Sequence, residues 1–140
     1  MCEKLYRLVA WLFEKANILR KPEGIKMRYV YKDNIIESLQ VLSDYNFQKQ
    51  ALLNPTGPYM WIYHEEYENI FEDTGLLEAW QDSEIVFNKE ADQALRVLEE
   101  AMRKIDSHLP DLVIVDLPEM QIVRQIAAQA LKLINEQQHS

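Results

Sequence analysis

Residues 110–118 read Pro-Asp-Leu-Val-Ile-Val-Asp-Leu-Pro, and the apolar run Leu112–Val115 at their centre is the main basis for the predicted fold. A continuous run of branched apolar side chains is typical of a strand that is buried on both faces of a sheet. Two other short segments, 27–31 and 84–87, are rich in aromatic or β-branched residues and are bounded by turn-forming residues. We therefore predict a small three-stranded sheet made of residues 27–31, 84–87 and 111–115.

Most of the remaining chain has the spacing of apolar residues that is typical of amphipathic helices. Five to seven helices are expected, over residues 3–20, 33–52 with a pause near 43–44, 58–75, 76–81, 89–106 and 118–135. Asp33 or Asn34 and then Asn88 are the expected N-caps, and Gly75 is the expected C-terminal cap. The sequence thus predicts one helix-rich α/β or α+β domain over residues 1–140. An all-α fold is the alternative, because each predicted strand is only four or five residues long.

The segment Leu112–Pro118 resembles the phosphoacceptor strand of bacterial receiver domains, in which an Asp ends an apolar strand. Further strands follow that Asp in receivers, whereas only one helix is predicted after it here. We therefore interpret Asp116 as the N-cap of the last helix, with Pro118 in its first turn.

The composition excludes several kinds of site. The 140 residues include one cysteine, Cys2, and three glycines. These are too few for a disulfide framework, a thiolate zinc site or a glycine-rich phosphate loop. His64 and Glu68 share a helix face without further ligands near them in the sequence, so we interpret them as part of a solvated acidic face. We predict no metal, no cofactor, no catalytic set and, since all apolar runs are short, no membrane association and a cytoplasmic location.

Charge is distributed unevenly along the chain. Residues 50–88 contain eight acidic residues and no Lys or Arg, so their charge of −8 equals the net charge of the whole protein. Basic residues gather instead between Lys15 and Lys32. Because the overall field repels phosphate, we expect no binding of nucleic acid. Because the acidic stretch attracts cations, we expect a basic protein partner.

The acidic stretch is also aromatic, with seven of the protein's fourteen Phe, Trp and Tyr residues. Tyr and Trp frequently anchor protein interfaces, and acidic neighbours steer a basic partner toward them. The predicted partner-binding residues are the anchors Tyr59 and Trp61 and the steering charges Glu65, Glu66 and Glu68. The sequence therefore predicts a non-catalytic interaction module.

The predicted layout is similar to barstar-like inhibitors, which are small acidic three-stranded α/β proteins that block a basic nuclease. The similarity lies in topology and charge, and it implies an immunity or inhibitor function. Two alternatives remain open. One is a small-ligand-binding or enzymatic domain with an aromatic-lined pocket, in which carboxylates or a histidine would converge. The other is a homo-oligomeric assembly subunit, such as a homodimer, that pairs through the apolar stripe of residues 5–19 or through the last helix.

Overall fold

The computed structural model describes residues 29–138, and their regular structure is entirely helical. The chain divides into two units, Met1–Val30 and Tyr31–Ser140, and every element described here belongs to the second unit. In chain order the elements are α2 (Lys32–Leu42), α3 (Tyr45–Leu53), α4 (Tyr63–Tyr67), the π-helical η1 (Glu68–Glu72), α5 (Leu76–Gln81), α6 (Lys89–Arg103), α7 (Asp111–Ile114) and α8 (Pro118–Gln138).

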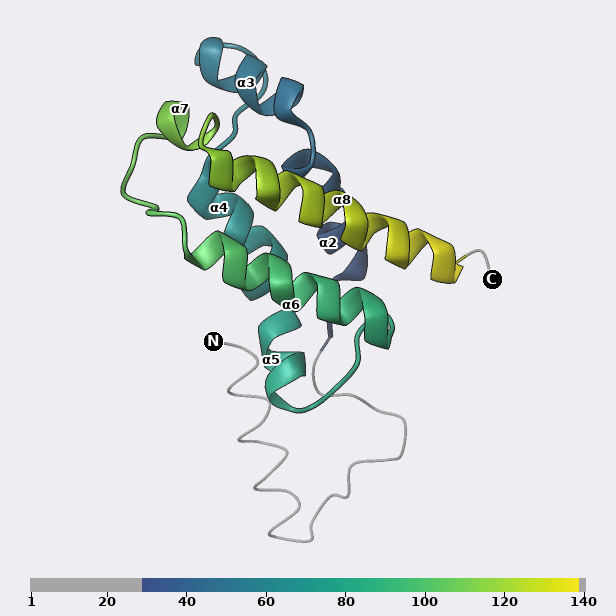
Figure 1. Cartoon of the computed structure of the whole chain (residues 1–140). Coiled ribbons are helices and arrows are strands. Elements are labelled where there is room, and N and C mark those ends of the chain that lie inside the picture. The colour runs from purple at the N-terminus through teal and green to yellow at the C-terminus, as the bar shows by residue number, and fades with distance from the viewer. Residues whose placement is uncertain (1–28, 139–140) are drawn as a thin grey trace, which may run out of the picture. The chain divides into compact units, whose positions relative to one another are not determined.

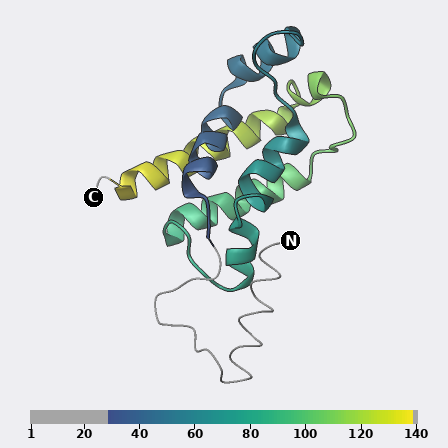
Figure 2. The ribbon, with the colours of Figure 1, turned by 180° about the vertical axis from the view of Figure 1, so that it is seen from behind.

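The helices of this unit pack in two layers. In Figures 1 and 2, α6 and α8 lie side by side in one layer, while α2 lies with α4 and η1 in the other. Helices α3 and α7 lie at one end of the unit, and α5 lies at the other. The core holds buried apolar side chains from both layers, among them Ile35, Leu39, Ile70, Phe71, Leu95, Leu98, Met120, Val123 and Ala127. The candidate site described below lies where α2, α3 and α4 approach one another.

The predicted three-stranded sheet is wrong, because the described residues contain no strand. The run at 111–115 forms the helical turn α7, in which the Pro110 carbonyl accepts hydrogen bonds from the Val113 and Ile114 amides at 2.9 and 3.0 Å. Ile114 and Val115 are fully buried, but Val113 is 46% exposed. A strand buried on both faces would hide every side chain of the run. The described part of the chain is therefore all-α, the alternative that the short strand lengths left open.

Segment 84–87 is a loop whose backbone amides hydrogen-bond to the carboxylate of Asp92. The amides of Val86 and Phe87 donate to the carboxylate of Asp92 at 2.7 and 2.9 Å, so a strand ladder cannot use them. Of the predicted strand at 27–31, residues 27 and 28 lie outside the described part, and residues 29–31 are irregular. The likeness to barstar-like inhibitors loses its topological basis together with the sheet.

Several predicted helix ends are confirmed by local caps. The Asn88 side chain accepts from the Ala91 amide at 2.8 Å at the start of α6. Asp44 accepts from the Phe47 amide at 2.9 Å, which restarts the chain as α3 after the predicted pause. Gly75 ends the helical segment with φ of 83°, in the left-handed region that favours glycine. These ends depend on contacts within a few residues, which the sequence displays directly.

Two other predicted helix starts differ from the structure. Helix α2 begins at Lys32, ahead of the expected caps Asp33 and Asn34. Helix α4 begins at Tyr63 rather than near Pro58, and residues 59–62 are irregular. The helix predicted over residues 3–20 lies outside the described part of the chain.

Asp116 has a different role from the predicted N-cap. Its carboxylate accepts from the Tyr45 hydroxyl at 2.8 Å and from Lys49 Nζ at 2.5 Å, which ties α3 to the chain ahead of α8. These two hydrogen bonds hold the pKa of Asp116 below its usual range. None of the helices within residues 29–138, α8 included, has the length and apolar character that a bilayer crossing requires.

Ile114 and Val113 give a direct test of the helical turn. Ile114→Ala should lower the free energy of unfolding by about 3 kcal/mol, because it empties a fully buried site. Val113→Ala should change it by less than about 1 kcal/mol, since this side chain is 46% exposed. Urea denaturation followed by circular dichroism measures both. Equal and large losses would support the buried strand instead.

Candidate functional site

The five predicted partner-binding residues divide into an outer and an inner group. Tyr59 is 64% exposed, Glu65 is exposed and Glu68 is half-buried. Trp61 and Glu66, by contrast, are only 3% and 7% exposed. Glu65 and Glu66 are neighbours on α4, so the helical turn of about 100° between them sends one side chain outward and the other inward. One short helix thus carries an exposed carboxyl at Glu65 and a buried carboxyl at Glu66.

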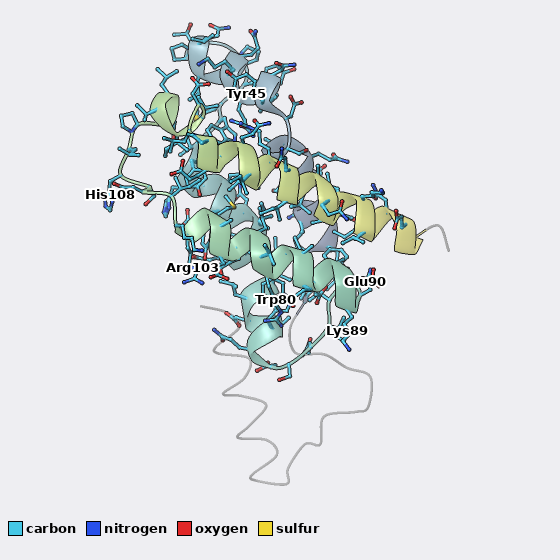
Figure 3. All side chains as sticks on the ribbon, in the orientation of Figure 1. Tyr45, Trp80, Lys89, Glu90, Arg103 and His108 are labelled. Atoms are coloured by element: carbon cyan, nitrogen blue, oxygen red, sulfur yellow. The ribbon has the colours of Figure 1, made fainter. Side chains whose placement is uncertain are left out.

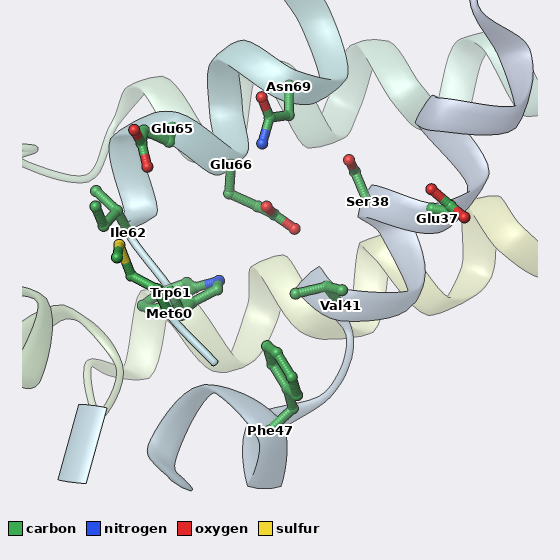
Figure 4. Close-up of a pocket in the computed structure, with 10 residues that line it drawn as sticks. All are labelled: Glu37, Ser38, Val41, Phe47, Met60, Trp61, Ile62, Glu65, Glu66 and Asn69. Carbon is green, nitrogen blue, oxygen red and sulfur yellow. The ribbon is translucent and has the colours of Figure 1, made fainter. Parts of the chain in front are cut away.

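The inner group borders a pocket of about 260 Å³. Helix α2 contributes one wall, segment 60–62 another, and α4 and the start of η1 a third (Figure 4). In Figure 4 the Glu66 carboxyl and the nitrogen-bearing edge of Trp61 both point into the space beside Ser38 and Val41. The lining residues are Glu37, Ser38, Val41, Phe47, Met60, Trp61, Ile62, Glu65, Glu66 and Asn69.

Two buried polar atoms at this pocket are left unpaired. Within the described part of the chain, neither Trp61 Nε1 nor Glu66 Oε1 has a hydrogen-bond partner. Native proteins rarely bury such atoms without a partner, because each loses its hydrogen bonds to water on folding. One of the two atoms is a donor and the other belongs to a carboxyl group. Both atoms are covered by the protein itself, so a molecule that enters the pocket pairs with them only where the lining side chains move aside.

Burial also changes the acidity of Glu66. Removal of the carboxyl from water disfavours its charged form and raises its pKa from the ordinary 4.5 to about 7. Near neutral pH this group therefore exists in both protonation states. A cation that enters the pocket favours the ionised state, whereas an anion is repelled by it.

The position of Trp61 follows from the packing of its neighbours. The ring of Tyr63 meets that of Trp61 edge to face, with 6.3 Å between ring centroids. The Tyr63 hydroxyl donates to the Met102 carbonyl at 2.6 Å, which fixes the start of α4 against α6. Burial raises the pKa of this hydroxyl, so it stays protonated and remains a donor. Trp61 therefore packs on a ring that is itself fixed by a hydrogen bond to α6.

The π-helical segment η1 borders the same pocket through Asn69. The wider turn is closed by the Asp73 amide, which donates to the Glu68 carbonyl at 2.8 Å. The Thr74 hydroxyl donates to the Ile70 carbonyl at 2.6 Å and supports the end of the segment. Short π-helical turns are rare, and they occur frequently at functional sites.

The charged groups around the pocket are acidic. Among its lining residues in the described part of the chain, the ionisable ones are Glu37, Glu65 and Glu66. His64 instead contacts Glu68, with 3.6 Å between Nε2 and Oε2, on the outer side of α4. No group of three or more potential metal ligands occurs within residues 29–138. The arrangement therefore suits an organic cation better than an anion.

An exposed apolar surface adjoins the pocket. Tyr59 and Met60 are 64% and 76% exposed, and Met60 also lines the pocket. The Tyr59 ring packs edge to face on Phe47 of α3, with centroids 5.6 Å apart. We call these two residues the Tyr59–Met60 surface. A partner that covers this surface also reaches the mouth of the pocket.

Sequence reasoning missed the contribution of α2 and α3 to this site. Ser38 and Val41 are three residues apart and share one side of α2, beside the buried stripe that contains Ile35 and Leu39. This spacing shows a half-buried face but does not show which segment covers it. The sequence therefore predicted only the part of the site that lies within residues 59–68.

Comparison with models of known protein families, with curated proteins and with solved structures gives no match for this chain.

Proposed function

We propose that this protein is an interaction module that binds a basic protein partner through the Tyr59–Met60 surface and its acidic surroundings. The observation that carries the proposal is the exposure of two large apolar side chains beside Glu65, in a stretch of 39 residues (50–88) without Lys or Arg. Exposed apolar side chains with a charged surround are typical of interaction sites. The acids attract a basic partner over distance, and the apolar pair supplies contact area after docking.

Binding of a small molecule is the second candidate function. It is supported by the pocket beside Trp61 and Glu66, where two buried polar atoms have no hydrogen-bond partner among residues 29–138. Its volume of about 260 Å³ lies below the range of about 300–1,000 Å³ usual for small-molecule sites. The pocket thus has room for one side chain or a small fragment rather than for a nucleotide or a large cofactor.

Charge reversal and removal of the apolar pair should affect binding differently. The partner is captured with the wild-type protein and purified, and association and dissociation rates are then measured at low salt. Glu65→Lys with Glu68→Lys should slow association about tenfold, because it reverses the steering field. Tyr59→Ser with Met60→Ser should speed dissociation about tenfold or more, because it removes the anchors.

Matched controls use exposed residues elsewhere in the unit. Glu100→Lys with Glu136→Lys repeats the change in charge, and Ile122→Ser removes an apolar side chain that is 53% exposed on α8. Both controls should leave the rates within about twofold of wild type. An acidic partner, or rates that neither double variant changes, would contradict the proposal.

A further inference from the structure

The pocket beside Trp61 and Glu66 has the features of a site for one positively charged side chain. Its two buried polar atoms, which lack partners among the described residues, are a donor and a carboxyl oxygen. Once the lining side chains move aside, an ammonium or guanidinium group supplies donors for Glu66 Oε1, and a peptide carbonyl supplies an acceptor for Trp61 Nε1. A basic residue within a polypeptide carries both groups at once.

The walls of the pocket match the shape of such a side chain. Val41, Phe47, Met60 and Ile62 provide apolar surface along it, while Ser38 lies opposite the Glu66 carboxyl (Figure 4). Lys and Arg bury their methylene chains along apolar surface and keep the charged end among polar groups. The volume of about 260 Å³ admits one such chain.

We propose that this pocket binds the cationic end of one Lys or Arg side chain of the basic partner, with Glu66 as the acceptor and Trp61 as a donor to the partner backbone. The proposal rests on the proposed function and deepens it, because it names the group that the site recognises. The Tyr59–Met60 surface adjoins the pocket through Met60, so one docked segment covers both.

The protonation of Glu66 couples this recognition to pH. With a pKa of about 7, roughly a tenth of the carboxyl is ionised at pH 6 and roughly nine tenths at pH 8. The other ionisable groups that line the pocket within residues 29–138 are Glu37 on α2 and Glu65 on α4. Since a cation binds the ionised form, affinity should rise about tenfold between pH 6 and pH 8, and binding should release a proton.

The test uses capped five-residue peptides with one central Lys or Arg, a matched peptide with norleucine, and n-butylammonium. The readout is the indole N–H resonance of Trp61 in ¹⁵N-labelled full-length protein. The Lys or Arg peptide should move this resonance and bind with a Kd on the order of millimolar, while the norleucine peptide should not bind. Affinity should follow the expected pH profile.

Two variants test the assignment of the pocket. Glu66→Gln should weaken peptide binding about tenfold and flatten the pH profile, whereas the exposed Glu72→Gln should do neither. Glu66→Gln should also keep the fold and raise the thermal midpoint at pH 8. The raised pKa of Glu66 means that the wild type loses stability as pH rises from about 4.5 to about 7, and the neutral amide does not. Ser38→Phe should block binding by filling the pocket, without a change to Glu66.

Several results would overturn the proposal. Equal binding of the norleucine peptide would show an apolar groove, and an unchanged Trp61 resonance would show that the pocket does not take these side chains. Binding of n-butylammonium without binding of the peptides would show a site for a free amine rather than for a partner side chain. If Glu66→Gln leaves partner binding unchanged while reversal of Glu65 and Glu68 slows it, this inference fails and the proposed function stands. If the peptides bind but that reversal changes neither partner rate, the proposed function fails instead.

Discussion

Asp92→Ala should lower the free energy of unfolding by about 4–6 kcal/mol, a large part of the stability of a domain of this size. The Asp92 side chain is 4% exposed, and its carboxylate accepts three hydrogen bonds. The donors are Trp80 Nε1 at 3.2 Å and the amides of Val86 and Phe87 at 2.7 and 2.9 Å. Alanine leaves all three donors without this acceptor, and each buried unpaired donor costs about 1–3 kcal/mol.

The loss should be measured by urea denaturation, followed by circular dichroism and by tryptophan fluorescence. Asp92→Asn should cost less than alanine, because the amide oxygen keeps one acceptor in place. Glu90→Ala, an exposed change in the same turn of α6, should stay within about 1 kcal/mol of wild type. A loss below about 1 kcal/mol for Asp92→Ala would show that the 84–87 loop does not depend on this carboxylate.

Arg124→Ala should lower the free energy of unfolding by about 3–5 kcal/mol, because it too removes a buried charged group that pairs with several polar atoms. Arg124 on α8 is 6% exposed, and its guanidinium donates to Gln48 Oε1 at 3.0 Å and to the Val115 carbonyl. It also lies over the Tyr45 ring, 4.7 Å from the centroid. These contacts hold α3 and the residue after α7 against α8, and their removal leaves buried acceptors unpaired.

Arg124→Met separates packing from hydrogen bonding, since it keeps the aliphatic stem. Its loss should remain above about 2 kcal/mol, because Gln48 Oε1 and the Val115 carbonyl lose the guanidinium donors in both variants. Arg124→Lys should recover only part of the loss. Its ammonium group keeps a charged donor, but it cannot replace the planar, multiply donating guanidinium. Equal stability of Arg124→Met and wild type in the same denaturation assay would contradict the role given to these hydrogen bonds.

The two changes should be nearly additive. Trp80, which contacts Asp92, and Tyr45, which contacts Arg124, lie at opposite ends of the unit (Figure 3). Distant sites without shared partners usually add within about 0.5 kcal/mol.

The helices could be predicted from the sequence because their signals are local. The Asn88 and Asp44 caps each bond to an amide three residues later, and Gly75 adopts its own left-handed conformation. The long apolar stripes of α6 and α8 likewise repeat with helical spacing over many residues. Such features depend little on distant parts of the chain.

The predicted strands at 84–87 and 111–115 are wrong because a short apolar run has no conformation of its own. A segment such as 111–115 becomes a strand only if another strand pairs with it. Here it packs beside α3 with Ile114 and Val115 buried, and this packing stabilises the short helical turn α7. Segment 84–87 shows the same dependence, since the buried Asp92 on the following helix takes up the amides that a ladder would need. In both segments the backbone conformation depends on contacts with residues outside the segment.

The candidate site divides in the same way. The amino-acid composition shows that residues 50–88 are acidic and aromatic, and it therefore predicts the sign of the charge presented to a partner. By contrast, the packing of the helices determines that Trp61 and Glu66 turn inward while Tyr59 and Glu65 remain exposed. Glu65 and Glu66 are identical residues at adjacent positions, so their intrinsic helix propensity does not distinguish the buried one from the exposed one. Burial is settled by which of them meets α2 and α3 when the helices pack, and that contact joins segments more than ten residues apart in the chain.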